Sequence, residues 1–282
     1  MLSVKKKIRI KSSRSLFDLR LQEVWDYRDL WFMFVKRDFL ASFKQTILGP
    51  LWFFVQPVLT TLIFTFVFGN IAGISTDGMP KILFYMSGLV IWNYFSEGFN
   101  KTANLFVSNA SMFGKVYFPR LIMPLSIVTS GLIRFAIQFC LFLGILLYFK
   151  ITGDTNVTPN WNILYVPLLV VMMAGYALGL GMIISSMTTK YRDLSMLVGF
   201  GVTLLMYATP VIYPLNAVPE KYVAVVKANP LVPIVEMFRY AFLGSGQVSA
   251  GGMLYSVTCM VCLLFGGIVI FNKVEQNFMD TV

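Results

Sequence analysis

The fold class is decided by Lys44-Gln-Thr-Ile-Leu-Gly-Pro-Leu-Trp-Phe-Phe-Val-Gln-Pro-Val-Leu-Thr-Thr-Leu-Ile-Phe-Thr-Phe-Val-Phe-Gly69. No residue between Ile47 and Gly69 is charged. Because an α-helix rises about 1.5 Å per residue, a helix of this length crosses a hydrocarbon core of about 30 Å. We therefore expect a membrane-spanning helix over about residues 48–70.

The composition extends this interpretation to the whole chain of 282 residues. Hydrophobic residues make up 57% of the chain and charged residues 13%, whereas about 25% of the residues in a soluble domain are charged. Further apolar segments alternate with short polar ones. The sequence thus predicts an all-α membrane protein with six transmembrane helices, over about residues 48–70, 82–99, 125–149, 163–187, 195–212 and 253–271.

Residues 1–47 form a basic arm ahead of the first span. No apolar run in its first part could act as a cleaved signal, so we expect the arm to stay in the cytoplasm. In its second half, Trp31, Val35 and Phe39 recur at helical spacing beside basic residues. This pattern is typical of an amphipathic helix that lies in the headgroup layer against membrane lipids. A cytosolic helix packed on its own protein is the alternative.

The connecting segments predict two smaller features. Residues 101–120 form a polar loop, and Pro119 and Pro124 interrupt any continuous helix, so we expect a short separate helix there. Residues 214–250 are amphipathic but too interrupted to span a bilayer, which favours a re-entrant or interfacial helix pair on the outer face. The tail, residues 273–282, is short and polar.

The distribution of charge predicts the orientation. If the arm is inside, 17 of the 23 Lys and Arg residues lie in cytoplasmic segments and five in outer ones. By the positive-inside rule, both termini are then cytoplasmic. The net charge of +10 is explained by these basic residues and anionic lipid, so we expect no nucleic-acid partner.

Two ionisable residues fall within expected spans. Glu97 lies near the inner end of the second span, where it needs water or a basic partner. Arg134 lies in the third span and should face other helices or an aqueous path, either paired, for instance with Gln138, or in contact with substrate. In the second outer helix, Glu236 and Arg239 have the spacing of an i,i+3 pair.

The fourth expected span is rich in small residues. Gly175, Gly179 and Gly181 lie within residues 163–187. Small side chains on one face let two helices approach closely in lipid. We therefore expect this span to pack tightly against neighbouring helices.

The sequence offers little chemistry of its own. It has no G-x-x-x-x-G-K-[ST] loop, no H-E-x-x-H motif and no histidine at all, so neither a nucleotide site, a metal site nor a proton relay is expected. Cys140, Cys259 and Cys262 lie in apolar runs and behave as small hydrophobic residues. The chain is therefore not expected to be an enzyme, and energy for transport against a gradient would come from a partner.

Several short motifs, in order from about residue 28 to 240, carry a resemblance to a known family. They are Lys44-Gln-Thr-Ile-Leu-Gly-Pro-Leu-Trp52 with Gln56-Pro57, Lys115-Val-Tyr-Phe-Pro-Arg-Leu121 with Pro124-Leu-Ser126, Arg192-Asp-Leu194, Thr209-Pro-Val-Ile-Tyr-Pro214, Val218-Pro-Glu220 and Asn229-Pro230. Together they resemble the membrane subunits of ABC-type polysaccharide exporters, the permeases for O-antigen, capsule and teichoic acid.

The resemblance implies a homodimeric permease that works with two ABC ATPase subunits, which bind ATP and Mg. It implies the export of a polyprenyl-linked polysaccharide across the bacterial plasma (inner) membrane. It also implies two short outer helices within about residues 216–242, and a coupling helix that contacts the ATPase within about residues 104–120. In that loop the residues expected to take part in coupling are Lys115, Tyr117, Phe118 and Arg120.

A path for a glycan needs aromatic rings for the C–H faces of the sugars and polar groups for their hydroxyls. Such residues recur at helical spacing in the first span and mark the end of the fifth. Rings at span ends also serve as ordinary anchors at the membrane interface, which is the alternative for each of them. The residues that we expect to line the path are Trp52, Phe53, Gln56, Thr60, Tyr207 and Tyr213.

Three other functions remain open at this stage. An ABC exporter of the same build could carry drugs or other lipids. An ion-coupled carrier would work without an ATPase, although such carriers generally show acids or broken spans in both halves. A membrane-embedded glycosyl- or acyl-transferase would need a general base, and a chain without histidine or an acid pair offers a poor one.

Overall fold

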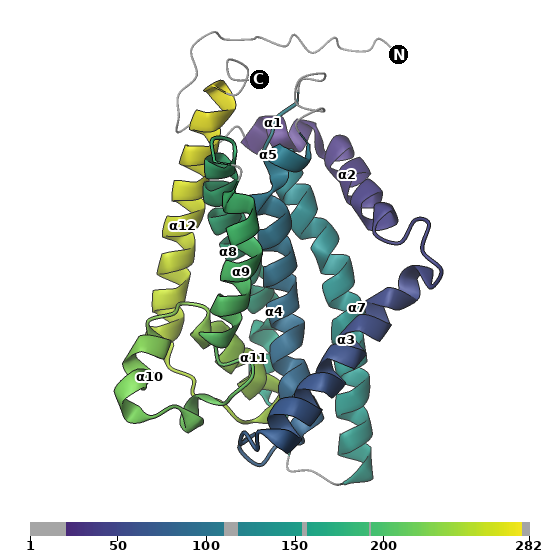
Figure 1. The fold of residues 1–282 in the computed structure, drawn as a ribbon, viewed down its shortest axis with the longest axis vertical. Helices are drawn as coiled ribbons and strands as arrows, with labels where there is room; N and C mark the ends of the chain where they lie inside the picture. The colour runs from purple at the N-terminus through teal and green to yellow at the C-terminus, as the bar shows by residue number, and fades with distance from the viewer. Residues whose placement is uncertain (1–20, 110–117, 154–156, 192, 278–282) are drawn as a thin grey trace.

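The computed structural model describes residues 21–109, 118–153, 157–191 and 193–277, and all regular structure in these ranges is helical. Figure 1 shows the helices gathered into one elongated bundle. In chain order they are α1 (Leu21–Asp26), α2 (Arg28–Ala41), η1 (Gly49–Leu51), α3 (Trp52–Phe64), the π-helical η2 (Thr65–Ile71), α4 (Lys81–Ala103), α5 (Leu105–Ser108), α7 (Ile122–Thr152), η3 (Trp161–Tyr165), α8 (Val166–Thr188), α9 (Leu194–Tyr207), η4 (Leu215–Ala217), α10 (Glu220–Lys227), α11 (Val232–Leu243) and α12 (Ala250–Asn277).

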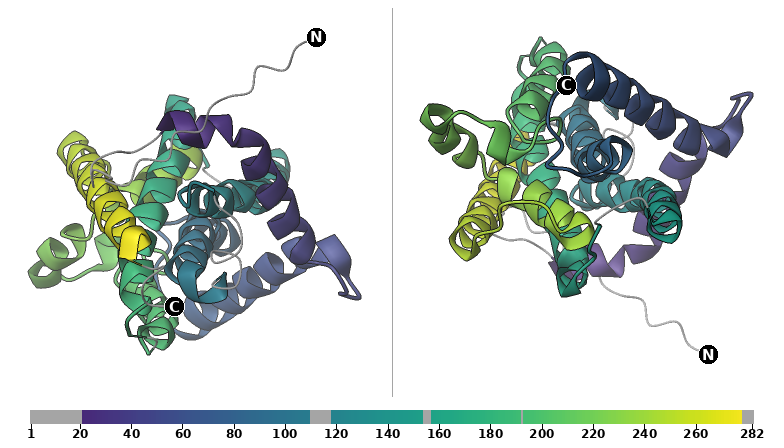
Figure 2. Two further views of the ribbon diagram at one scale, coloured as in Figure 1. Left: turned by 90° about the horizontal axis from the view of Figure 1, so that it is seen from above. Right: turned by 90° about the horizontal axis from the view of Figure 1, so that it is seen from below.

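The centre of the bundle is α4. It packs against α3, α7, α8, α9 and α11, and the two end-on views in Figure 2 show it surrounded by other helices. Every residue from Leu83 to Trp92 is buried. Because its neighbours cover it, α4 can carry polar residues that a helix facing lipid could not.

Glycines set the distance between α8 and its neighbours. A methyl group added at Gly179 would lie 2.7–2.8 Å from the backbone of Leu263 in α12, and one added at Gly175 would lie 2.6 Å from the sulfur of Met260. On the α4 side, one added at Gly181 would lie 2.6 Å from Thr102. The predicted close packing of this span is therefore confirmed, and it joins α8 to both α12 and α4.

Four of the expected spans have the length and hydropathy to cross a bilayer. Within the described residues these are Gly49–Ile71, Ile122–Thr152, Trp161–Thr188 and Ala250–Val274. The other two expected spans fall on α4, which carries charged residues toward its end, and α9, which is apolar but has only 14 residues. Their crossing of the membrane, and so the total of six, stays a prediction.

The helix of the third span begins earlier than expected. The prolines suggested a start at residue 125, whereas α7 runs from Ile122 with Pro124 in its first turn. A proline is tolerated there because the first backbone N–H groups of a helix have no partner within it.

The two ends of the bundle differ in what caps them. At one end lie α1, α2 and α5, together with the C-terminal end of α12, and we call this the arm end (Figure 1). At the other, the far end, lie α10 and α11 (Figure 1), in the segment where the sequence predicts a helix pair. Whereas α10 has no buried residue, α11 is largely buried against α4, α8 and α12.

A pair of glycine substitutions tests the packing of α8 on α12. We expect Gly179→Ala to lower the free energy of unfolding by about 1–3 kcal/mol, because the added methyl group must push the Leu263 backbone away. The measurement is thermal or denaturant unfolding of the detergent-solubilised protein.

The matched control is Gly144→Ala in α7, where an added methyl group meets nothing within 4 Å. It should be neutral or slightly stabilising, because Ala favours helix more than Gly does. Equal stability of the two variants would contradict the packing described.

Candidate functional site

A cluster of charged side chains lies between four segments toward the arm end. Glu97 of α4 forms an ion pair with Arg134 of α7, and Lys101, one turn further along α4, lies 2.7 Å from the same carboxylate. Arg134 also donates a hydrogen bond to Ser42 in the segment after α2. Its guanidinium lies 5.2 Å from the centre of the Phe53 ring of α3. We call these groups the Glu97 cluster.

The Glu97 cluster changes one sequence-based expectation. Gln138 was suggested as a partner for Arg134, but its amide oxygen instead accepts a hydrogen bond of 3.3 Å from Asn93. Arg134 pairs with Glu97 because a carboxylate binds a guanidinium more strongly than an amide oxygen does. The expectation that Glu97 needs a basic partner is confirmed.

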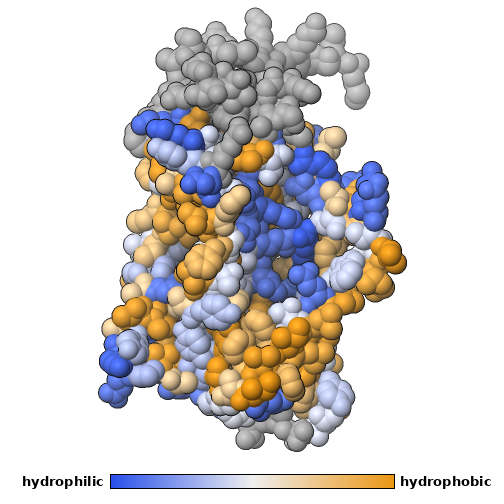
Figure 3. All heavy atoms as spheres, viewed as in Figure 1, coloured by the Kyte–Doolittle hydropathy of each residue, from blue (hydrophilic) through white to orange (hydrophobic). Residues whose placement is uncertain are grey.

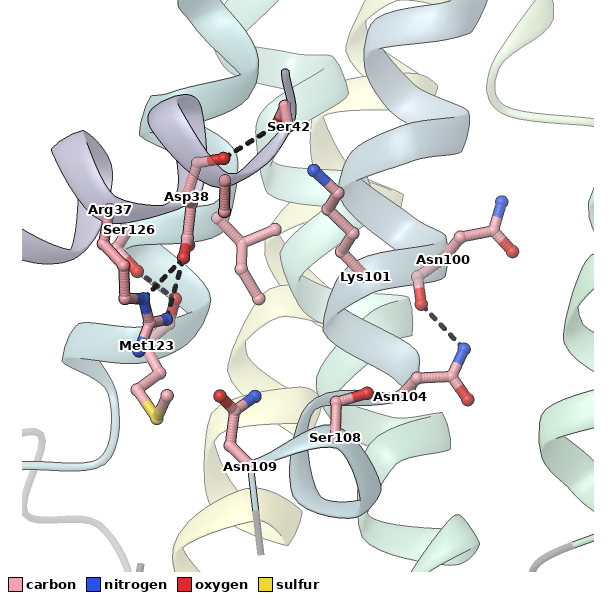
Figure 4. A pocket seen from close by; sticks show the side chains of 12 residues that line it. Arg37, Asp38, Ser42, Asn100, Lys101, Asn104, Ser108, Asn109, Met123 and Ser126 are labelled. Carbon is pink, nitrogen blue, oxygen red and sulfur yellow. Dashed lines mark hydrogen bonds and ion pairs between the residues drawn. The ribbon is translucent and has the colours of Figure 1, made fainter. Parts of the chain in front are cut away.

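A cavity of about 470 Å³ opens beside this cluster, and we call it the arm-end cavity. Figure 3 shows hydrophilic atoms gathered below α2, with hydrophobic surface beside and below them. Figure 4 shows residues of α2, α4, α5 and α7 turned toward the cavity, with Lys101 pointing toward α2. The polar residues of its wall include Arg37, Asp38, Asn100, Lys101, Asn104 and Ser108.

The asparagines of the wall share one arrangement. The amide nitrogens of Asn100, Asn104 and Asn109 each donate to the backbone carbonyl four residues earlier, at 2.8, 2.9 and 3.0 Å. Each of these bonds uses one of the two N–H groups of the amide and turns its oxygen away from that carbonyl, so the amide oxygen remains as an acceptor. The wall also contains two cationic donors, Arg37 and Lys101. Arg37 pairs with Asp38 at 2.8 Å, and Lys101 pairs with Glu97.

Sequence reasoning missed this cavity, although part of its pattern was visible. Glu97, Lys101 and Asn104 follow one another at steps of four and three, so they share one face of a helix. The contribution of Arg37 and Asp38 from α2 carried no such signal, because it depends on how α2 docks. Within the described ranges, no three His, Cys, Asp or Glu side chains come together.

At the far end, the predicted pair of Glu236 and Arg239 is formed at 3.1 Å, with each side chain only 2% exposed. Arg239 also donates to the carbonyl of Val211 at 3.2 Å, and its guanidinium lies 3.9 Å from the centre of the Phe84 ring of α4. Glu236 accepts a bond of 2.8 Å from the backbone of Gln247. These contacts join α11 to α4 and to the segment after α9.

The residues expected to line a path are divided by the structure into two groups. Trp52 and Tyr207 are 44% and 50% exposed, and Gln56 is exposed as well. Both of their helices, α3 and α9, pack against α4 and lie on the same side of the bundle (Figures 1 and 2). These three side chains are therefore available to a ligand or a partner on that side.

The other three expected lining residues make contacts within the chain. The Phe53 ring stacks on that of Phe39 in α2, with centroids 5.7 Å apart. Thr60 donates to the carbonyl of Gln56, and Tyr213 donates to the carbonyl of Tyr207 at 3.0 Å. Phe53 thus anchors α2 to α3, and Tyr213 braces the end of α9.

The residues expected to couple to an ATPase are described only in part. Lys115 and Tyr117 lie outside the described residues. Phe118 and Arg120 are 4% and 7% exposed, and Phe118 packs edge-on against Phe34 of α2 at 5.6 Å between ring centres. Because the chain itself covers both side chains, neither is well placed to touch a partner directly, and Phe118 is suited to hold the start of α7 against α2.

Comparison with known proteins gives one family and a consistent group of relatives. A family model described as ABC-2 type transporter matches residues 29–243. An O-antigen export system permease protein of Klebsiella pneumoniae is 27% identical over 254 residues, which is 89% of this chain and 94% of the relative. One from Myxococcus xanthus is 25% identical over 93% of this chain and 98% of its own length. The polysialic acid transport protein KpsM of Escherichia coli is 23% identical over 87% and 93%.

The Glu97 cluster can be tested with a double-mutant cycle. We expect Glu97→Gln and Arg134→Gln each to lower the free energy of unfolding by about 1–3 kcal/mol, because each removes the partly buried ion pair between α4 and α7. The double variant should lose clearly less than the sum, since it removes both charges of the pair. Unfolding in detergent measures the effect.

The control for this cycle is Asp193→Asn, which removes an exposed carboxylate and should leave stability within about 0.5 kcal/mol. If the losses from Glu97→Gln and Arg134→Gln simply add, the two side chains do not interact as described.

Proposed function

Because this chain belongs to the ABC-2 type transporter family, we propose that it is the membrane subunit of an ATP-driven exporter of a lipid-linked polysaccharide. One observation carries the proposal: permeases for O-antigen export match 89% and 93% of this chain, and the matches cover 94% and 98% of the permeases' own lengths. The match to KpsM, a polysialic acid transport protein, adds a relative that transports a different polysaccharide. These matches support a polysaccharide as the substrate, and we propose that it is linked to a polyprenyl lipid, as the resemblance implies.

The energy source is a separate protein in this proposal. The chain has no phosphate-binding loop of the P-loop type, so two ABC ATPase subunits bind ATP and Mg and dock at the arm end. Residues 101–120 receive their motion. In this arrangement Phe118 transmits it to α2, because its ring packs against Phe34 of that helix. Translocase activity then belongs to the complex and not to this chain alone.

The placement in the membrane follows from the same reasoning. The protein lies in a bacterial plasma (inner) membrane with the arm end and both termini in the cytoplasm, as the distribution of Lys and Arg supports. Both α4 and α9 cross the bilayer, which brings the number of spans to six. Two copies pair through the side on which α3 and α9 lie, and exposed apolar residues such as Leu59, Phe66 and Phe200 support this face.

The path for the glycan runs between the two copies. On each copy Trp52, Gln56 and Tyr207 line it, since these side chains are exposed on the side that would face the partner. Rings stack on the C–H faces of sugars and amides bond their hydroxyls. An exporter of drugs or other lipids would have the same fold. Its substrate would not need a path lined by both aromatic rings and an amide side chain.

The proposed function predicts dependence on an ABC ATPase. Deleting this chain should remove the polysaccharide from the cell surface and accumulate it in the cytoplasm, and an ATPase variant unable to hydrolyse ATP should do the same. The full-length chain should also co-purify with the ATPase. Unchanged surface polysaccharide in the deletion strain, or uphill transport by the purified chain alone, would contradict the proposal.

The path predicts a second result. We expect Trp52→Ala and Tyr207→Ala to reduce export several-fold while the complex with the ATPase still forms, because each removes an aromatic face on which the C–H groups of a sugar can pack. Surface polysaccharide on intact cells is the measurement. Trp161→Ala and Tyr148→Ala are the matched controls, since both rings are exposed on other helices, and equal effects in the two sets would argue against a path at α3 and α9.

A further inference from the structure

We propose that the arm-end cavity binds the phosphate-bearing sugar at the lipid end of the exported glycan. This inference rests on the proposed function, because it assigns a site to one part of the same substrate. The shared chemistry is a phosphosugar: an anionic phosphate next to a ring with hydroxyl groups. The charge, acceptors, size and position of the cavity each point to such a group.

The charges around the cavity favour one anion. Among the described residues that line the cavity, two are cations, Arg37 and Lys101, and one is an acid, Asp38. The side chains of Arg37 and Lys101 are 40% and 39% exposed, so both cations stay within reach of a ligand while they pair with the acids. A phosphate there gains charge-assisted hydrogen bonds from a guanidinium and an ammonium.

The acceptors in the wall favour a sugar beside that anion. Each of Asn100, Asn104 and Asn109 uses one side-chain N–H for a backbone carbonyl and keeps its amide oxygen as an acceptor. Acceptors placed next to a purely anionic ligand would repel it. They are suited to hydroxyl groups, which donate hydrogen bonds and which a sugar carries on most of its carbons.

The size of the arm-end cavity and the apolar part of its wall also fit a phosphosugar. A volume of about 470 Å³ falls in the range of about 300–1,000 Å³ for small-molecule sites, and a lone phosphate would leave most of it unfilled. Met123 and Ile127 form an apolar part of the wall, against which the C–H face of a sugar can pack.

The position of the cavity lets a carrier lipid stay in the bilayer. The wall is built from the last turns of α4, α5, the first turns of α7 and the C-terminal part of α2. These are the levels at which spans leave the hydrocarbon and headgroups begin. The hydrophobic surface beside and below the hydrophilic patch in Figure 3 offers a place for the polyprenyl chain.

The test is equilibrium binding to the full-length chain in complex with its ATPase, in nanodiscs. The probes are a polyprenyl diphosphate carrying one sugar, the same lipid without sugar, a soluble hexose 1-phosphate and phosphatidylglycerol. We expect the sugar-bearing lipid to bind most tightly and the hexose phosphate to compete with it. Lys101→Gln and Asn104→Ala should each raise its Kd by about tenfold or more, as expected for losing a hydrogen bond to a charged or well-oriented group.

Matched controls and a second variant keep the result interpretable. Lys190→Gln and Asn162→Ala, which lie away from the cavity, should leave the Kd unchanged. Asn104→Asp keeps the side-chain size, so a weakened Kd in a variant that still binds the ATPase cannot be attributed to a collapsed wall.

Three outcomes would overturn the inference: equal Kd values in the cavity variants and the parent, equal binding of the lipid without sugar, or equal binding of phosphatidylglycerol. The first places the ligand elsewhere, the second removes the role of the sugar, and the third makes the cavity a general lipid site. Each leaves the proposed function standing if deletion of the chain still traps polysaccharide in the cytoplasm. Without such trapping, the proposed function fails whatever the cavity binds.

Discussion

The arrangement of the bundle depends on where a few charges can be placed in a bilayer. A carboxylate and two cations inside or near hydrocarbon are costly unless they meet one another. In this protein they meet at Glu97, which holds Arg134 of α7 and Lys101 of its own helix. Because Arg134 also reaches Ser42, the same cluster connects the arm to the membrane helices.

The central position of α4 follows from this constraint. A helix with Asn93, Glu97 and Lys101 along it is poorly suited to face lipid, so α3, α7, α8, α9 and α11 cover it. Glycines of α8 then let α12 and α4 approach that helix to contact distance. The side of α3 and α9 that faces away from α4 remains uncovered, which is where a second copy and a glycan path are proposed.

The two ends of the bundle use charge in different ways. At the far end, Glu236 and Arg239 are almost wholly buried and bonded to backbone and to each other, an arrangement suited to holding α11 rigidly. At the arm end, Arg37 and Lys101 are paired yet partly exposed beside an open cavity. A rigid far end and an accessible arm end are consistent with loading and energy input from one side of the membrane.

The sequence by itself determined the membrane class, the four most apolar spans, the helix pair before the last span, the tight packing of the glycine-rich helix and the pair of Glu236 and Arg239. Each of these features depends on hydropathy or on residue spacing within a single segment, and both can be read from residues that are close together in the sequence. Only the tertiary structure decided that Arg134 binds Glu97 instead of Gln138, that Phe118 is buried against α2, and that α2 closes one wall of the arm-end cavity. Those contacts join residues far apart in the chain, and helical periodicity says which face of a helix is polar but not which other helix will meet it.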